Sequence, residues 1–177
     1  MFCAGTLFRC PNGDLTRVEE IQTHETLMGH NGVFVDVSEY IPYAACEEQD
    51  LVSLHTNQGS VVVTAEHRVV VMRGVQRQTI PAGHLYIGMT VCCTDGEETL
   101  IDIRRWRDTI PLFKITFSPD VAIETFNEPR ENAILTKGCK LAIRTRRSGM
   151  TRRSFFVIAE STNTIYPTST KKHGAWP

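Results

Sequence analysis

The sequence lacks the features that mark membrane proteins, secreted precursors and nucleic-acid-binding chains. No apolar run approaches the roughly 18 residues that a membrane-spanning helix needs, and the first residues hold neither the basic nor the apolar stretch of a signal peptide. The formal net charge of the 177 residues is only -1, so the chain as a whole has no electrostatic attraction to nucleic acids or membranes. These absences, with a hydrophobic content of 41%, indicate one ordinary globular domain.

Cysteine is present, but the spacing that would give it a metal-binding or redox role is absent. No Cys-x-x-Cys pair occurs, which argues against a zinc ribbon or a thioredoxin-like site, and we expect neither a metal nor a cofactor. The even number of cysteines would allow disulfides. Because no secretory signal is visible, we favour free thiols and an intracellular location, although the sequence does not fix the compartment. The six are Cys3, Cys10, Cys46, Cys92, Cys93 and Cys139.

Short apolar or alternating segments separated by turn residues run through the sequence, and helical periodicity is nearly absent. Many of these segments are rich in β-branched residues, which pack well on a pleated sheet. The clearest hairpin joins residues 50–56 to residues 60–64 through Asn57-Gln58-Gly59. We therefore predict an all-β fold of many short strands with little helix, the weak helix candidate being residues 43–49. Further strands are expected at residues 3–10, 33–37, 69–71, 89–93, 100–106, 112–117, 121–126 and 133–136.

A polar Thr-x-x-His step interrupts the valine-rich centre of the chain. Thr64 follows Val61-Val62-Val63, and His67 precedes Val69-Val70-Val71. At the end of a strand, the hydroxyl and the imidazole can face one small volume, where they could hydrogen-bond a strained peptide and protonate its leaving nitrogen. Taken alone, the pattern is more typical of a strand end with a surface turn. Cys3, near the chain start, adds a nucleophile and makes a reactive site the better interpretation.

The composition changes after Cys139. The basic residues that follow, with no acidic residue before Glu160, are Lys140, Arg144, Arg146, Arg147, Arg152 and Arg153. Such a run is usually a solvated face or a loose tail, and binding of an anion or a nucleic acid is the less common alternative. We expect residues 1–2 to be an upstream flank, residues 3–139 to form the domain, and residues 140–177 to be a basic extension in which residues 155–158 add one strand.

Several segments, in order, resemble the Hint superfamily, which comprises inteins, the autoprocessing part of Hedgehog proteins and bacterial intein-like domains. Cys3-Ala4-Gly5-Thr6-Leu7, followed by Val18-Glu19-Glu20-Ile21, resembles the opening block, which a cysteine begins. Residues 59–67 resemble the block that contributes the threonine and the histidine. Residues 80–88 and 112–138 resemble the later connector and the closing strands. The resemblance implies a horseshoe-shaped all-β Hint fold and a self-processing activity.

The resemblance implies that Cys3 attacks the carbonyl carbon of Phe2 and replaces the Phe2–Cys3 amide by a thioester, an N-to-S acyl shift. Because this exchange is uphill, the site must strain the amide and protonate its nitrogen. His67 would be the proton donor, since an unperturbed histidine has a pKa of about 6.5; Thr64 would orient the peptide, and Cys3 would act as the thiolate. The substrate would be the protein's own N-terminal flank. Water or a small nucleophile would accept the acyl group, and the scheme needs no metal, cofactor, nucleic acid, membrane or second subunit.

The closing segment departs from that of inteins, which end in His-Asn before a cysteine, serine or threonine. Here Lys137 stands in the place of the histidine, Gly138 in the place of the asparagine, and Cys139 follows. Glycine has no side-chain amide, so asparagine cyclisation cannot release a downstream flank. We therefore predict hydrolysis or transfer to an outside nucleophile instead of splicing. Lys114 occupies the position of the family's acidic residue, for which Asp120 is the nearest substitute.

Four residues are candidate accessory groups: Asp120, Lys137, Cys139 and His84. Cys139 could be a second acyl acceptor or an ordinary free thiol, and His84 could reach the site from its connector.

The departures from the family pattern keep a second class of function open, a Hint-derived β-domain that has lost its chemistry and binds a protein partner. An inert, buried Cys3 thiol would favour this binding domain.

Overall fold

The computed structural model describes residues 1–129 and 132–140; the strand expected at residues 155–158 and nearly all of the basic extension lie outside them. The described residues contain fifteen β-strands and three single turns of 3-10 helix, so the all-β prediction is confirmed. In this part of the chain no helix has the length and apolar content needed to cross a membrane. One compact unit spans Met1–Leu141, and it includes Met1 and Phe2, which we had expected to be a flank.

Most strands are only a few residues long. They are β1 (Phe2–Cys3), β2 (Leu7–Arg9), β3 (Leu15–Arg17), β4 (Thr26–Met28), β5 (Phe34–Tyr43), β6 (Gln49–His55), β7 (Ser60–Thr64), β8 (Arg68–Arg73), β9 (Gln76–Pro81), β10 (Thr90–Cys93), β11 (Gly96–Thr99), β12 (Asp102–Asp108), β13 (Leu112–Ser118), β14 (Ile123–Thr125) and β15 (Ile134–Lys137). The helical turns are η1 (Val18–Glu20), η2 (His30–Gly32) and η3 (Ala82–His84).

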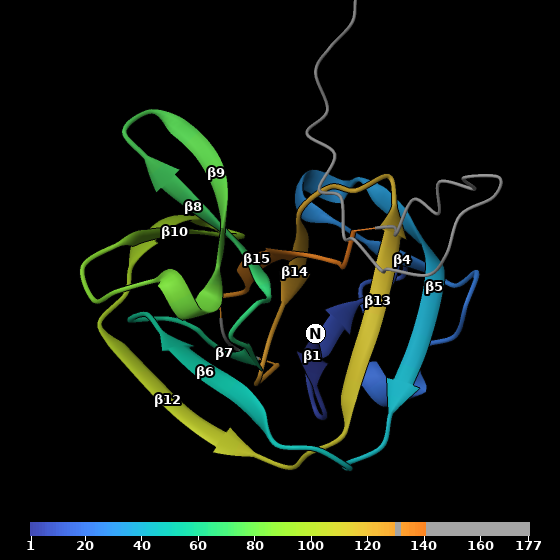
Figure 1. The fold of residues 1–177 in the computed structure, drawn as a ribbon. Coiled ribbons are helices and arrows are strands. Elements are labelled where there is room, and N and C mark those ends of the chain that lie inside the picture. Colours follow the sequence, from blue (N-terminus) through green and yellow to red (C-terminus); the bar gives the residue numbers. More distant parts are fainter. Residues whose placement is uncertain (130–131, 141–177) are drawn as a thin grey trace, which may run out of the picture. The chain divides into compact units, whose positions relative to one another are not determined.

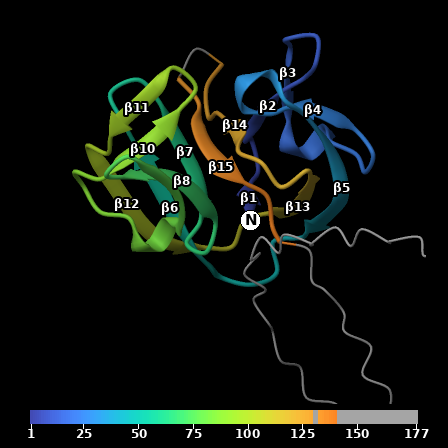
Figure 2. The same ribbon diagram turned by 90° about the horizontal axis from the view of Figure 1, so that it is seen from above.

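The N-terminal strand lies in the middle of the larger sheet (Figure 1). This seven-stranded sheet has the order β12-β6-β7-β1-β13-β5-β4, and a six-stranded sheet has the order β11-β10-β15-β8-β9. Phe2 pairs with Val63 of β7 on one side and with Phe113 of β13 on the other. In a second view, β1, β14 and β15 lie in the middle of the molecule, with β6 to β12 on one side and β2 to β5 on the other (Figure 2). The first residues of the chain are therefore enclosed by segments that come much later in the sequence.

The predicted hairpin is confirmed by the pairing of β6 with β7, from Leu51↔Thr64 to His55↔Ser60. The weak helix candidate at residues 43–49 is wrong, because β5 runs to Tyr43 and β6 begins at Gln49. Four strands were not predicted: β3, β4, β9 and β11. Of these, β9 and β11 are exposed along most of their length, so they carry no apolar alternation that a sequence pattern could reveal.

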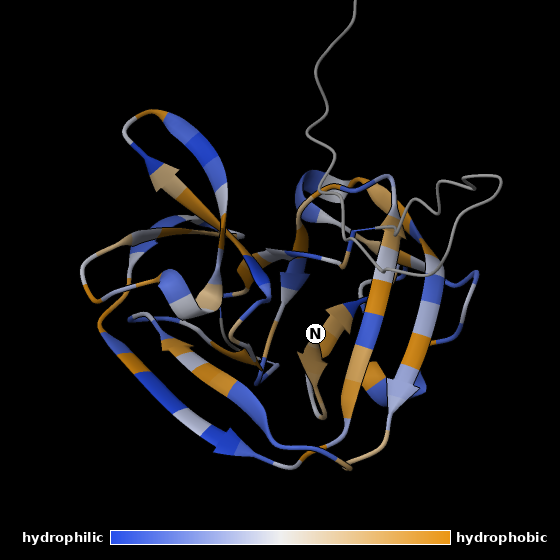
Figure 3. Ribbon diagram, in the orientation of Figure 1, coloured by the Kyte–Doolittle hydropathy of each residue, from blue (hydrophilic) through white to orange (hydrophobic). Residues whose placement is uncertain are grey.

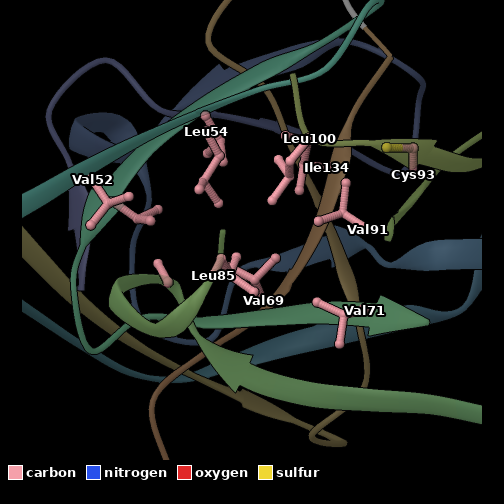
Figure 4. Packing of buried hydrophobic residues seen from close by; sticks show 12 residues of the cluster. Val52, Leu54, Val69, Val71, Leu85, Val91, Cys93, Leu100 and Ile134 are labelled. Carbon is pink, nitrogen blue, oxygen red and sulfur yellow. The ribbon is translucent and has the colours of Figure 1, made fainter. Parts of the chain in front are cut away.

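Two large apolar clusters form the core. One joins valines of β6, β7 and β8, such as Val52, Val69 and Val71, to Leu85, Leu100 and Ile134 (Figure 4). The other surrounds Phe2, which is fully buried and whose ring packs edge-on against Phe8 at a centroid distance of 4.9 Å. Figure 3 shows the apolar colour of β1 and the alternation of apolar and polar residues along β13. Burial of a phenylalanine contributes about 1.5–3 kcal/mol, so the aromatic ring of residue 2 holds the start of the chain in place.

Candidate functional site

The nitrogen of the first residue is fixed by Thr64, at the end of β7. The amino group of Met1 donates a hydrogen bond to Thr64 Oγ1 at 2.6 Å, and the Thr64 N–H donates to the Met1 carbonyl at 3.2 Å. Both bonds continue the pairing of β1 with β7, in which Phe2 lies opposite Val63. The predicted threonine therefore contacts the backbone of residue 1.

His67 lies one turn beyond Thr64, as the Thr-x-x-His spacing predicts. The backbone N–H of His67 donates to the Thr64 carbonyl at 2.9 Å. The imidazole ring packs against the Phe2 ring at a centroid distance of 4.4 Å and an interplanar angle of 62°. His67 is buried, and its Nε2 has no hydrogen-bond partner among the described residues. Burial lowers the pKa of His67 well below 6.5, and the charges of the Met1 amine and Arg68 lower it further. The imidazole is therefore neutral near neutral pH.

Cys3 lies on the other face of β1. Successive side chains of a strand point to opposite faces; Phe2 packs against His67, whereas Cys3 packs with Leu51 and Leu112. Burial raises the pKa of Cys3 to about 12, although the charge of the N-terminal amine counteracts this. The structure does not bring the Cys3 thiol to the face that His67 occupies, in contrast to our expectation, and the role of Cys3 as nucleophile stays a prediction.

A cavity of about 740 Å³ opens beside Met1. It brings together Thr64, His84 and Cys139, which were predicted as site residues from separate parts of the sequence. His84 comes from η3 and Cys139 follows β15. The lining residues are Met1, Gln49, Asp50, Thr64, Ala65, Glu66, Pro81, Gly83, His84 and Cys139.

The Met1 amine and Cys139 interact electrostatically in this cavity. Burial lowers the pKa of the amine from 8.0, while Cys139, Cys3 and Glu66 act in the opposite direction. Cys139 also contributes to the raised pKa of Lys114, although the main cause there is the hydrogen bond to Glu39, whose Oε2 lies 2.8 Å from Lys114 Nζ. Cys139 is half-buried and lines the cavity, so it is the thiol nearest to the Met1 nitrogen among the residues of that lining.

Asp120 and Lys137 take part in hydrogen bonds at the end of β15, and neither residue lines the cavity. Arg68, the residue after His67, donates to Asp120 Oδ1 at 2.7 Å and to Asp120 Oδ2 at 3.0 Å, and its Nε donates to the Gly138 carbonyl at 2.8 Å. Lys137 Nζ donates to the Asp120 carbonyl at 3.0 Å. These bonds connect the turn that carries His67 to the residue that precedes Cys139.

Gly138 has no room for a side chain. A Cβ atom at this position would lie 2.7 Å from the Ile115 carbonyl oxygen and 2.6 Å from Phe117 Cδ2. The neighbouring Cys139 N–H donates to that same Ile115 carbonyl at 2.7 Å, so the backbone cannot shift without losing this bond. The position where inteins carry their asparagine, according to the sequence resemblance, is therefore closed to asparagine in this packing.

Sequence reasoning missed Met1, Asp50, Glu66 and Arg68. Glu66 lies inside the Thr-x-x-His step, and Arg68 directly follows it, so their proximity to the site could have been inferred from the predicted turn. Met1 and Asp50 give no local signal, because their positions depend on strand pairing. Among the described residues, no group of three or more histidine, cysteine, aspartate or glutamate side chains could hold a metal ion.

The fold is similar to that of several solved inteins. A bacterial intein-like domain from Clostridium thermocellum matches with a TM-score of 0.60 and 16% identity, covering 76% of this chain and 96% of that chain. The gp41-1 intein matches with a TM-score of 0.59 and 16% identity, covering 76% and 96%. A splice-inactive, GSH-linked variant of the AceL NrdHF class 3 split intein matches with a TM-score of 0.61 and 10% identity, covering 78% and 98%.

These comparisons confirm the resemblance to Hint domains at the level of the fold. The chain has the intein-like Hint fold over about three quarters of its length. No model of a protein family and no curated protein sequence matches the chain.

Proposed function

We propose that this protein is a self-processing domain that cleaves the peptide bond formed by the nitrogen of its own residue 1. The observation that supports this proposal is the 2.6 Å hydrogen bond between that nitrogen and Thr64 Oγ1. In a chain that continues upstream of Met1, the same nitrogen would be an amide, and the Thr64 hydroxyl would be placed to orient it. The cavity beside Met1 gives the acyl group on that nitrogen a place to lie.

Cys139 is the nucleophile in this proposal. Its thiolate attacks the carbonyl carbon of the residue before Met1, the bond from that carbon to the Met1 nitrogen breaks, and the nitrogen takes up a proton. The resulting thioester on Cys139 is then hydrolysed by water, which frees the upstream carboxylic acid and restores the thiol. The Met1 side chain is a thioether and cannot attack, whereas Cys139 lines the same cavity as Met1 and Thr64.

His67 relays a proton to the departing nitrogen: its neutral imidazole takes up the proton that the Cys139 thiol loses and passes it to the nitrogen. The positive charge of the Met1 amine is one of the causes that lower the pKa of His67. An acylated nitrogen carries no charge, so this cause is absent before cleavage and the imidazole accepts a proton more readily in the precursor than in the product. Proton transfer of this kind typically raises the rate of a reaction by roughly 10²–10⁴-fold.

The N-to-S shift from Phe2 to Cys3 is the alternative route to self-processing, and a β-domain that binds a protein partner is the second candidate function. The burial of Cys3, which raises its pKa to about 12, favours either Cys139 as the nucleophile or the binding function. Both self-processing routes release the upstream flank, but they leave different ends.

The test is a fusion of a reporter protein to residue 1 of the full chain, treated with hydroxylamine and analysed by mass spectrometry. We expect release of the reporter without Met1 and Phe2, and loss of release in the Cys139→Ala and His67→Gln variants but not in Cys3→Ala. Release of a reporter that ends in Met1-Phe2, abolished by Cys3→Ala, would establish the N-to-S shift instead. A reporter that stays attached would support the binding domain.

A further inference from the structure

The cavity beside Met1 is lined by acidic side chains that take no part in the proposed cleavage. Two carboxylates line it, Asp50 and Glu66. Asp50 is already paired, because Arg107 Nε lies 2.9 Å from its Oδ1. Within residues 1–129 and 132–140, the Glu66 side chain makes no hydrogen bond and no salt bridge, and it lines the cavity together with Met1.

The Met1 nitrogen carries a positive charge only while it is a free amine. When an acyl group is attached, the nitrogen becomes an uncharged amide, and no lysine or arginine is among the residues that line the cavity with Glu66. An unpaired carboxylate at the mouth of a cavity attracts a cation more strongly than one that is already compensated. A positive side chain carried by the upstream segment would replace the charge that acylation removes.

The cavity is suited to such a side chain. Its volume of about 740 Å³ lies within the range of roughly 300–1,000 Å³ that is common for ligand sites. Pro81, Ala65 and Gly83 give it apolar wall, against which the methylene stem of an arginine or lysine can pack while its charged end remains near water. His84 and Gln49 also line the cavity, and Glu66 is the acidic residue of this lining that has no salt bridge among the described residues.

We infer that this cavity binds the residue immediately upstream of Met1, and that Glu66 selects an arginine or lysine at that position. The inference rests on the proposed function, since it assigns the substrate class of the same site. It makes Glu66 a specificity-determining residue.

The test compares full-length chains that carry a short upstream peptide ending in Arg, Gln or Glu before Met1. Because Glu66 is exposed, the expected preference is modest: we expect cleavage about three- to tenfold faster with Arg than with Glu, and Gln in between. The Glu66→Gln variant should bring the three rates within about twofold of one another. The exposed Glu97→Gln variant is the matched control and should keep the preference. Raising the salt concentration should shrink the preference in the parent chain.

Two outcomes separate this inference from the proposed function. Equal rates for all three peptides, in a chain that cleaves, would overturn the inference and leave the self-processing function standing. If no fusion cleaves, the proposed function fails, and the thermal unfolding midpoints of the same fusions decide the inference. A higher midpoint for Arg than for Glu, lost in Glu66→Gln, would support binding of a basic residue, and equal midpoints would overturn it.

Discussion

The amino group of Met1 donates a hydrogen bond of 2.6 Å to the side-chain oxygen of Thr64. The two residues are brought together by the pairing of β1 with β7, and the Thr64 N–H donates back to the Met1 carbonyl. The threonine of the Thr-x-x-His step therefore hydrogen-bonds the nitrogen of residue 1. The expected site of reaction, the nitrogen of Cys3, lies two residues further along the chain. This relationship determines which peptide bond the site would break.

The Thr64 hydroxyl should be needed for cleavage, and its methyl group should not. Thr64→Val keeps the shape of the side chain but removes the hydrogen bond to the Met1 nitrogen. A hydrogen bond to a charged or reacting group is worth about 1.5–3 kcal/mol, so we expect release of an upstream reporter to slow by roughly 10- to 100-fold. Thr64→Ser should stay within about threefold of the parent rate. A parent-like rate for Thr64→Val would show that this contact is not part of the reaction.

The stability of the protein should fall as the pH drops below about 6.5 because of His67. The pKa of His67 is lowered well below 6.5 in the folded state, so at lower pH the unfolded chain takes up a proton that the folded protein does not. The free energy of unfolding then decreases by about 1.4 kcal/mol per pH unit for this one group. We expect denaturant unfolding between pH 6 and pH 5 to show that the free energy of unfolding of His67→Gln changes less with pH than that of the parent, by this amount per pH unit.

The exposed His84 provides the control for this pH dependence. His84→Gln removes an exposed imidazole from the same site, so the difference between the slopes of His84→Gln and His67→Gln isolates the contribution of the buried ring. Equal slopes for the parent chain and His67→Gln would mean that His67 is protonated in the folded protein.

The cysteines should differ widely in their reactivity toward iodoacetamide. Burial raises the pKa of Cys3 and of Cys93 to about 12, so both remain thiols at pH 8 and react slowly. The exposed Cys46 should react first, and the half-buried Cys139 should react faster than Cys3. Peptide mapping after short labelling checks the order, and labelling in denaturant should remove the differences. Labelling of Cys3 as fast as Cys46 would contradict the structure of β1.

Gly138 should not tolerate any side chain. Gly138→Ala places a Cβ atom against the Ile115 carbonyl oxygen at 2.7 Å, and overpacking of this kind costs about 1–3 kcal/mol. We expect a lower midpoint of urea unfolding for Gly138→Ala, and Gly138→Asn should also be destabilised and gain no release of downstream residues. Lys137→Ala, at the preceding half-buried position, removes one exposed hydrogen bond to the Asp120 carbonyl and should lower the free energy of unfolding by no more than about 1 kcal/mol. A Gly138→Asn variant of parent stability would contradict the close packing found here.

The sequence revealed the features that depend on neighbouring residues. The hairpin of β6 and β7 and the turn from Thr64 to His67 follow from local alternation and turn chemistry, and both are confirmed. The Hint fold was also correctly inferred, because several short motifs occur in the order that the family requires.

The position of the N-terminal strand could not be predicted in the same way. Phe2 is placed by Val63 and Phe113, which lie far away in the sequence, and no local pattern reveals such partners. A two-residue strand is also too short to show which face each side chain takes, so the sequence does not reveal that Cys3 and His67 lie on different faces of β1. The same reason explains why Asp50 was missed, since strand pairing brings it to the cavity.

The most direct test of the account is the mass of the fragment released from a reporter fused upstream of Met1. Cleavage at the nitrogen that Thr64 contacts predicts a reporter that ends at its own last residue and a domain that retains all 177 residues of the sequence. A reporter that carries Met1 and Phe2 at its C-terminus would contradict the account, because the broken bond would then be the one between Phe2 and Cys3.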